Sequence, residues 1–196
     1  MFRLGLTGSI ATGKSTVLEA FRDLGVPVYS ADAAVAELYS GEAVAAVDAL
    51  FPGVAVNGVI DRQLLAERLR LDPAGFARLE AVVHPLVQGR IGDFLASAEE
   101  AGYALAVVEV PLLYESGHDY GFDAVAVTHV DEDEQRRRAL ARPGMNVDKL
   151  DTIIARQLPQ AEKKQRADYL IDTGTSIAET RAAVAALVDS IRHRQG

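Results

Sequence analysis

Eight residues near the start of the chain have the types and the spacing that bind nucleotide phosphates. The run GSIATGKS, Gly8 to Ser15, fits the phosphate-loop pattern G-x-x-x-x-G-K-[ST]. Gly8 and Gly13 allow backbone angles closed to other residues, so successive N–H groups can surround phosphate oxygens at the positive end of a following helix. Lys14 adds a charge for the β and γ phosphates, and the Ser15 hydroxyl can hold the Mg²⁺ that bridges them. The predicted ATP-binding residues are Gly8, Ser9, Ile10, Ala11, Thr12, Gly13, Lys14, Ser15 and Thr16.

Two carboxylates follow apolar runs and are expected beside this loop. Asp32 comes after Val26–Ser30, and Glu109 lies near the end of Ala104–Val110. Because parallel strands open their sites at the carboxyl edge of the sheet, Asp32 could accept a proton from an attacking hydroxyl, and Glu109 could reach Mg²⁺ through water. Each residue has an alternative role. Asp32 could cap a helix that starts near Ala33, and Glu109 could pair with a basic residue on a covering helix.

Two arginines, Arg138 and Arg142, are four residues apart on the predicted helix Asp133–Arg142 and so are expected on one face of it. Two guanidinium groups in that arrangement can clamp phosphate oxygens and neutralise the charge that develops during transfer. The alternative is a solvated basic face that answers the acidic residues Asp131 to Glu134 at the start of the helix.

His84 precedes Pro85 in a segment of helical composition. No second His, Asp or Glu stands at a metal-ligand spacing from it. A buried, hydrogen-bonded histidine and a contact to substrate are both open as its role.

The elements that must position these residues alternate between short apolar runs and longer segments of helical period. That pattern predicts an α/β fold of the P-loop NTPase type, with a parallel sheet of about five strands flanked by helices. The predicted strands are Arg3–Thr7, Val26–Ser30, Ala104–Val110, Ala124–His129 and Tyr169–Ile171. The predicted helices include Ser15–Leu24, closed by Gly25 in a left-handed cap, Asp133–Arg142 and Ile177–Arg194.

The alternation fails between about residues 40 and 102, where Ala, Leu, Glu and Arg recur at helical spacing and only Val54–Ile60 could extend. We interpret this region as a helical insertion between the second and third strands. A chain of 196 residues that is 49% hydrophobic can bury one sizeable core. The sequence therefore predicts one domain over residues 1–196, with its core at about 1–39 and 103–196.

Charge and composition exclude several classes of function. A formal net charge of -8 disfavours a surface built to hold nucleic acid, since such a surface needs a broad basic face. The absence of cysteine removes disulfides, Cys-ligated zinc and thiol nucleophiles. The most apolar stretch is too short and too interrupted to cross a membrane, and no secretory signal is expected. A cytoplasmic location is expected.

Motifs along nearly the whole chain together carry a resemblance to one family. They are LTGSIATGKST from Leu6, SAD ending at Asp32, DR at Asp61 and Arg62, HPLV from His84, VPLLYE from Val110 to Glu115, Gln135 with Arg138 and Arg142, RQLP from Arg156, Lys163, and ADYLID from Ala167. In this order they resemble the dephospho-CoA kinases, which make coenzyme A in the last step of its synthesis. The phosphate loop is shared by many families, whereas HP, PLLYE and ADYLID are narrower.

The resemblance implies that the γ-phosphoryl group of ATP is transferred to the 3′-hydroxyl of the dephospho-CoA ribose. It implies Asp32 as the general base, Lys14 and the loop as the ATP site, and Mg²⁺ held at Ser15. It further implies a lid at about residues 136–166 that contains Arg138 and Arg142, and an acceptor-binding insertion with Arg62 and His84 near the acceptor. ATP and dephospho-CoA are the implied partners, and a monomer or small homo-oligomer is expected.

Two departures from the family pattern carry structural expectations. The family usually has glycine where this chain has Ser9 and Ala11, and side chains there are tolerable if the backbone angles are ordinary. Thr173 stands where the family often has asparagine after the last strand, so a backbone contact near Gly174 would have to replace an asparagine contact to adenine.

Two other functions compete with this interpretation. A nucleoside or nucleotide monophosphate kinase would share the loop, the aspartate and the arginine lid, but would need a pocket that recognises a base. A nucleotide-dependent switch would usually carry Asp-x-x-Gly after a strand and Asn-Lys-x-Asp for guanine. The Asp-x-x-Gly here, at residues 72–75, lies in a helical region, and Asn-Lys-x-Asp is absent.

Overall fold

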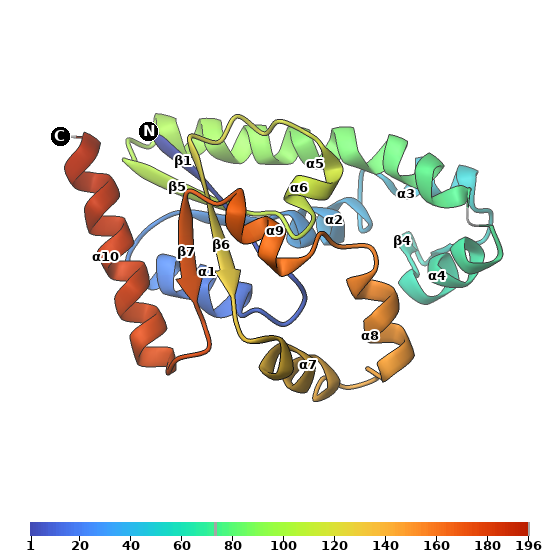
Figure 1. Cartoon of the computed structure of the whole chain (residues 1–196). Helices are drawn as coiled ribbons and strands as arrows, with labels where there is room; N and C mark the ends of the chain where they lie inside the picture. Colours follow the sequence, from blue (N-terminus) through green and yellow to red (C-terminus); the bar gives the residue numbers. More distant parts are fainter. Residues whose placement is uncertain (73, 196) are drawn as a thin grey trace. The chain divides into compact units, whose positions relative to one another are not determined.

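A computed structural model of the chain describes residues 1–72 and 74–195; position 73 of the predicted insertion and position 196 at the end of the predicted domain lie outside this description. The chain forms two compact units (Figure 1). The first comprises Met1–Ser30 and Leu95–Gly196, and the second comprises Ala31–Phe94.

The first unit is built on a five-stranded parallel sheet in the order β2-β5-β1-β6-β7. Its strands are β1 (Phe2–Thr7), β2 (Val28–Ser30), β5 (Leu105–Glu109), β6 (Ala124–His129) and β7 (Tyr169–Asp172). The predicted α/β class and five-stranded parallel sheet are confirmed. The second strand begins two residues later than predicted, after Pro27, although the carbonyl of Pro27 still accepts a hydrogen bond from Val107 N at 3.0 Å. The central strand β1 leads directly into the phosphate loop.

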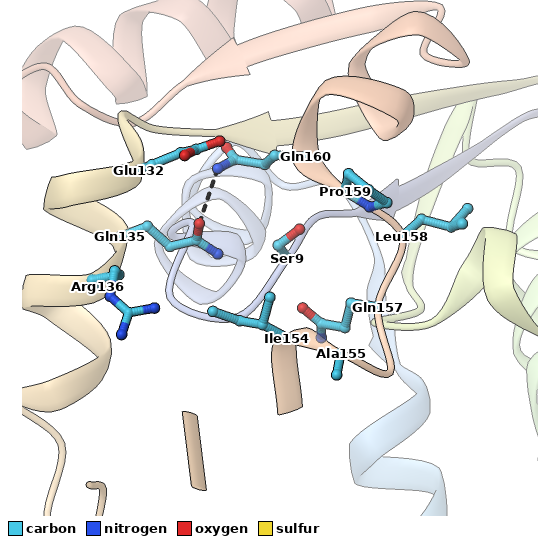
Figure 2. Close-up of a pocket in the computed structure, with 10 residues that line it drawn as sticks. All are labelled: Ser9, Glu132, Gln135, Arg136, Ile154, Ala155, Gln157, Leu158, Pro159 and Gln160. Carbon is cyan, nitrogen blue, oxygen red and sulfur yellow. Dashed lines mark hydrogen bonds between the residues drawn. The ribbon is translucent and has the colours of Figure 1, made fainter. Parts of the chain in front are cut away.

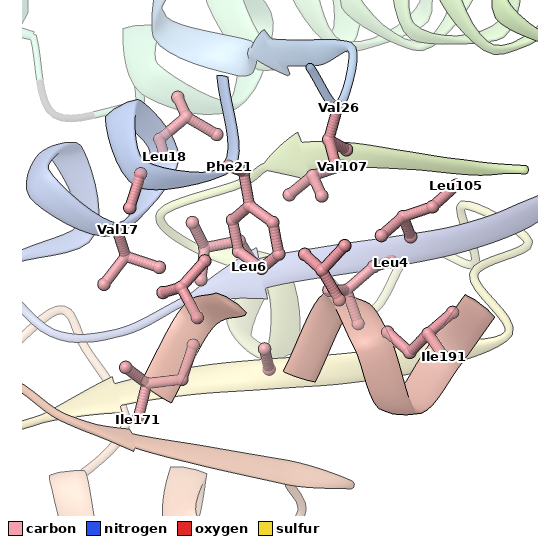
Figure 3. Packing of buried hydrophobic residues seen from close by; sticks show 14 of the residues in the cluster. Leu4, Leu6, Val17, Leu18, Phe21, Val26, Leu105, Val107, Ile171 and Ile191 are labelled. Carbon is pink, nitrogen blue, oxygen red and sulfur yellow. The ribbon is translucent and has the colours of Figure 1, made fainter. Parts of the chain in front are cut away.

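The main core lies between this sheet and two helices, α1 (Lys14–Asp23) and α10 (Ile177–Gln195), which pack against each other. Alternate residues Leu4 and Leu6 of β1 are fully buried there, together with Phe21 of α1 and Ile191 of α10 (Figure 3). The amphipathic period of each helix supplies these residues. Gly25 follows α1 with φ 73°, as predicted for a left-handed cap.

Four shorter helices complete the first unit. They are α6 (Leu113–Ser116), α7 (Glu132–Leu140), α8 (Val147–Ile154) and α9 (Gln160–Gln165). Capping residues fix where two of them begin. Asp131 accepts a hydrogen bond from Asp133 N at 2.9 Å at the start of α7, and Asn146 accepts one from Lys149 N at 2.9 Å at the start of α8. Helix α7 ends two residues before the predicted Arg142.

The second unit is mostly helical, as its composition indicates. It holds α2 (Ala31–Leu38), α3 (Val44–Leu50), α4 (Arg62–Leu71) and the start of α5 (Gly75–Glu100). The segment Val54–Ile60, expected to extend, forms a small antiparallel hairpin of β3 (Ala55–Val56) and β4 (Val59–Ile60). Asn57 and Gly58 turn this hairpin with φ 51° and 79°, as two-residue hairpin loops require. No helix within residues 1–72 and 74–195 is long and apolar enough to span a bilayer.

A buried ion pair ties two helices of the first unit together. The ammonium of Lys163 on α9 lies 2.7 Å from Glu115 Oε1 on α6, and the two side chains are 0% and 13% exposed. Glu115 Oε1 also accepts a hydrogen bond from Leu158 N at 2.8 Å, and Lys163 donates to the carbonyl of Pro111 at 3.4 Å. The carboxylate therefore holds both α9 and the segment before it.

Replacing Glu115 with Gln is expected to lower the free energy of unfolding by about 3 kcal/mol, because it leaves the buried ammonium of Lys163 without its counter-charge. Urea denaturation measures the change. Asp23→Asn is the matched control, since it breaks an ion pair with Arg181 that is 2.6 Å long but 45% and 50% exposed. That change should cost less than about 1 kcal/mol. Equal losses of unfolding free energy in the two variants would contradict a stabilising role for the buried Glu115–Lys163 pair. Recovery of stability when Glu115→Gln is combined with Lys163→Met would support that role.

Candidate active site

The phosphate loop leaves the central strand and turns into α1 with the backbone geometry that its glycines allow. Gly8 and Gly13 have φ 156° and 81°, as the sequence predicts. A Cβ at Gly8 would lie 2.8 Å from the carbonyl oxygen of Thr128 on β6, so the chain passes too close for any side chain. Within the loop, Thr12 Oγ1 donates to the carbonyl of Ser9 at 2.9 Å and shares a 2.8 Å hydrogen bond with Thr128 Oγ1.

One expectation for this loop is wrong. Ala11 has φ 61°, in the left-handed region, so its backbone angles are not ordinary. A residue with a Cβ in this conformation costs about 1–2 kcal/mol relative to the right-handed region. The surrounding contacts must hold Ala11 there, because its own preference opposes the conformation.

Lys14 begins α1 and folds back across the loop. Its ammonium donates to the carbonyls of Gly8 at 2.8 Å and Ser9 at 3.1 Å. The residue before the helix, Gly13, offers no side chain to cap the first turn, so the positive end of α1 points at the loop. Ser15 lies exposed in this first turn. The Lys14 ammonium and the N-terminus of α1 together concentrate positive potential where the phosphates of a nucleotide would lie.

Glu109 ends β5 at the edge of the sheet from which the loop emerges. The strand registers set it opposite Leu6 of β1 and opposite Ser30 of β2. The Glu109 side chain is 7% exposed, and its Oε2 accepts a hydrogen bond from Ser30 Oγ at 2.7 Å. The two roles of Glu109, reaching Mg²⁺ through water and pairing with a basic residue on a covering helix, both stay predictions.

The oxygen atoms at this edge fit Mg²⁺ in chemical type. A hydroxyl at Ser15 and a carboxylate at Glu109 are hard donors, which Mg²⁺ prefers. Within the described part of the chain, no cluster of three or more His, Cys, Asp or Glu side chains could form a metal cage by itself. The donor set therefore suits an ion that arrives with water and nucleotide phosphates.

Asp32 is the second residue of α2 and is exposed. The helix begins at Ala31, so Asp32 lies inside the first turn and is not the residue that caps it. The capping role that competed with catalysis is therefore wrong. The chain continues directly from Ser30, the last residue of β2, into this turn.

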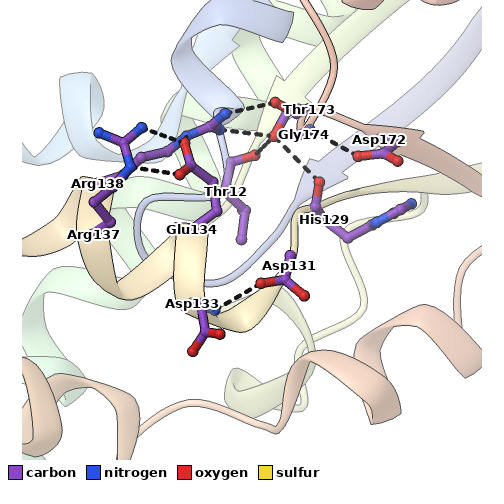
Figure 4. A network of polar contacts seen from close by, with 10 residues as sticks. All are labelled: Thr12, His129, Asp131, Asp133, Glu134, Arg137, Arg138, Asp172, Thr173 and Gly174. Carbon is purple, nitrogen blue, oxygen red and sulfur yellow. Dashed lines mark hydrogen bonds and ion pairs between the residues drawn. The ribbon is translucent and has the colours of Figure 1, made fainter.

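Arg138 projects from α7 toward the loop that follows β7 (Figure 4). Its Nη2 donates to the carbonyl of Thr173 at 2.8 Å, and its Nε pairs with Glu134 Oε1 at 2.7 Å. Arg137 binds the same carboxylate, 2.6 Å from Oε2. The hydrogen bonds from Arg137 and Arg138 lower the pKa of Glu134 to about 2. Glu134 thus stays charged and fixes the direction of Arg138.

Arg142 does not share a helix face with Arg138. Helix α7 ends at Leu140, and Arg142 lies in the following turn, where its N–H donates to the carbonyl of Ala139 at 3.1 Å. Pro143 and Gly144 follow at once and prevent the helix from continuing. The predicted pair of arginines on one face is therefore wrong, and Arg142 is an exposed residue of the connection to α8.

The second unit contains the two residues expected near an acceptor. His84 lies exposed on α5, so the alternative of a buried histidine is wrong. Arg62 is exposed at the start of α4, and its guanidinium stacks over the Tyr39 ring at 5.6 Å. Asp61 accepts hydrogen bonds from Gln63 N at 2.8 Å and Leu64 N at 3.1 Å, which makes it the cap of α4.

Thr173, which departs from the family pattern, has a structural role that was not predicted from the sequence. Thr173 is 5% exposed, and its hydroxyl donates to the carbonyls of Thr12 at 3.0 Å and His129 at 3.2 Å. It therefore bridges the phosphate loop, the end of β6 and the end of β7. Burial and the charge of Lys164 lower the pKa of His129, although Asp172 opposes them. For Thr173 the available signal was a small hydroxyl residue two positions after the last predicted strand.

Comparison with known proteins gives a consistent result. The family profile described as dephospho-CoA kinase matches residues 2–179. A dephospho-CoA kinase of Rhodopseudomonas palustris (strain BisB18) is 52% identical over 181 residues, which cover 92% of this chain and 91% of that protein. A solved Thermus thermophilus structure superposes with a TM-score of 0.82 at 31% identity, covering 96% of this chain and 97% of the other. A shikimate kinase from Bacteroides thetaiotaomicron shares the fold, with a TM-score of 0.54 at 19% identity over 97% and 98% of the two chains.

The contrast between two glycines tests the loop geometry. Gly8→Ala is expected to raise the Kd for ATP by roughly tenfold or more, because the methyl group would displace the loop from Thr128. Gly25→Ala is the matched control. It also has a positive φ and flanks the same helix, but nothing lies within 4 Å of its added Cβ. Isothermal titration calorimetry measures both affinities, and an unchanged Kd in Gly8→Ala would contradict the close approach.

Proposed function

This chain belongs to the dephospho-CoA kinase family, and we propose that its phosphate loop, Asp32 and Glu109 form the site at which it phosphorylates dephospho-CoA. The reaction is the final step of coenzyme A biosynthesis, and the enzyme is an ATP-dependent transferase with an alcohol acceptor. The observation that supports the assignment of the site is the meeting of the loop with the ends of β2 and β5 at one sheet edge.

Transfer begins with the 3′-hydroxyl oxygen of the dephospho-CoA ribose, which attacks the γ-phosphorus of ATP. The new O–P bond forms as the bond to the β–γ bridging oxygen breaks, and ADP leaves. The hydroxyl proton goes to the carboxylate of Asp32. The exposed position of Asp32 immediately after β2 supports this role, since an acceptor must be able to reach the carboxylate.

The loop holds ATP by its N–H groups and by Lys14. In the ATP complex the Lys14 ammonium exchanges the carbonyls of Gly8 and Ser9 for β and γ phosphate oxygens, a movement of a flexible side chain that keeps the charge in the loop. Ser15 and Glu109 would hold Mg²⁺, which when bound with ATP supplies positive charge to the phosphates. Arg138 neutralises charge as the transfer proceeds, with Glu134 fixing its orientation.

The remaining proposals concern the rest of the chain. Residues 40–102 bind the acceptor, with the exposed Arg62 and His84 as candidate contacts. Residues 136–166 act as a lid that excludes water from the transferring phosphate, and Arg142 belongs to it. The cytoplasmic location and the state of a monomer or small homo-oligomer stay predictions from the sequence.

The first experiment measures ADP release with ATP, Mg²⁺ and dephospho-CoA, and identifies the product by its mass. A rate that depends on dephospho-CoA, with coenzyme A as product, is expected. Lys14→Ala should abolish turnover and serves as the inactive control. ADP release with nucleosides or nucleoside monophosphates, and none with dephospho-CoA, would instead support a nucleotide kinase.

Replacing Asp32 with Asn tests the general base. The variant keeps the size of the side chain but removes its basicity, so kcat should fall roughly 100-fold or more while the Kd for ATP stays unchanged. Steady-state kinetics and calorimetry separate the two quantities. Asp189→Asn, which changes an exposed carboxylate on α10, is the matched control and should keep the wild-type kcat. Full kcat in Asp32→Asn would exclude the assignment.

A further inference from the structure

Two glutamine side chains from the C-terminal half hold one peptide segment of the phosphate loop. Ile10 N donates to Gln157 Oε1 at 2.9 Å, and Gln135 Nε2 donates to the carbonyl of Ile10 at 2.8 Å. Ile10 and Gln135 are 9% and 7% exposed. The N–H and the carbonyl of Ile10 are therefore both hydrogen-bonded to side chains from outside the loop.

A third glutamine fixes the orientation of the second. Gln160 Nε2 donates to Gln135 Oε1 at 3.0 Å (Figure 2). Gln160 Oε1 accepts from Val130 N at 3.0 Å. Gln135 thus accepts with its oxygen and donates with its nitrogen, so its amide has one orientation that satisfies both contacts. The chain of contacts runs from the end of β6 to Ile10.

The segment that supplies Gln157 and Gln160 is itself anchored. Between them, Leu158 donates its N–H to Glu115 Oε1, the oxygen that also pairs with the buried Lys163. This segment and α7 line a cavity of about 540 Å³ beside Ser9. The buried ion pair therefore anchors the segment that supplies Gln157 and Gln160.

The position of these contacts coincides with the strained part of the loop. Ala11, with φ 61°, directly follows Ile10. A conformation that a residue disfavours persists only when its surroundings determine it, and here the two hydrogen bonds fix the peptide on the N-terminal side of Ala11. Thr12, hydrogen-bonded to Ser9, closes the loop on the other side.

We propose that Gln157 and Gln135 are positioning residues for ATP binding: they hold the loop at Ile10 in the shape that its phosphate-binding amides require. The inference rests on the proposed function in assigning the loop to ATP, and it does not require either glutamine to touch the nucleotide. If loss of a glutamine lowers the population of the competent loop, the apparent Kd rises by the inverse of that population.

Gln157→Leu removes the acceptor for Ile10 N at similar side-chain size, and Gln135→Met removes the donor to the Ile10 carbonyl. Each is expected to raise the Kd for ATP roughly tenfold, as one lost hydrogen bond with a buried partner would do. The KM for dephospho-CoA should stay unchanged. Because both act through Ile10, the double variant should be much less than additive in a double-mutant cycle. Asp189→Leu, which places the same apolar side chain at an exposed position of α10 outside the loop and the lid, is the matched control.

A second measurement separates positioning from general stability. Amide hydrogen exchange at Ile10 should quicken in Gln157→Leu while the exchange of β1 amides stays unchanged, and Asp189→Leu should alter neither. A wild-type Kd for ATP in both single variants, or strictly additive effects in the double variant, would overturn the proposal. If Gln157→Leu does not fold, Gln135→Met carries the test alone through its Kd and the exchange at Ile10.

These readouts are independent of the acceptor. Calorimetry uses ATP without dephospho-CoA, so the glutamine proposal is tested even if the wild-type chain fails to phosphorylate dephospho-CoA. Failure of that activity with normal ATP binding would count against the proposed acceptor only. A wild-type Kd for ATP in the glutamine variants, together with normal phosphorylation of dephospho-CoA by the wild-type chain, would count against the positioning role only.

Discussion

A loop that binds phosphate with its own N–H groups cannot use those groups to stabilise its own conformation. The remaining structure must therefore hold the loop from outside. In this chain several contacts stabilise the loop. Gly8 packs against Thr128, and the Thr173 hydroxyl donates to the Thr12 carbonyl. Gln135 and Gln157 hydrogen-bond to Ile10. These contacts come from the ends of β6 and β7, from α7 and from the connection between α8 and α9. The parallel order of the sheet is what brings those ends to one edge.

Three charged side chains of the site have partners within the chain. Lys14 lies on two loop carbonyls, Arg138 on Glu134 and Thr173, and Glu109 on Ser30. A nucleotide must replace some of these contacts with its own, which lowers the net binding free energy gained from each phosphate. The same contacts keep the charged groups oriented before the nucleotide binds. This explains how a chain with a net charge of -8 can take a polyanion, since the positive charges are local and fixed.

The sequence predicted the fold and the loop well because both depend on local signals. Apolar runs of strand length bounded by Gly or Asp identify β1 and β6, and the glycines of the loop identify its positive φ angles at Gly8 and Gly13 but not at Ala11. Helix ends were less predictable. Helix α7 stops before Arg142 because Pro143 and Gly144 end it, so the expected pair with Arg138 on one face does not form. His84 is exposed although its apolar surroundings in sequence allowed burial.

By itself the sequence determined the strand order along the chain, the phosphate loop, the helical insertion and the family, since each follows from residue types at short spacing. Only the tertiary structure decided that Ala11 adopts a left-handed conformation, that Asp32 lies within its helix and not at its cap, and that Thr173, Gln135 and Gln157 support the loop. The physical reason is separation along the chain. Gln157 meets Ile10 across 147 residues, and a hydrogen bond between such distant groups depends on how the strands pair and not on any local pattern.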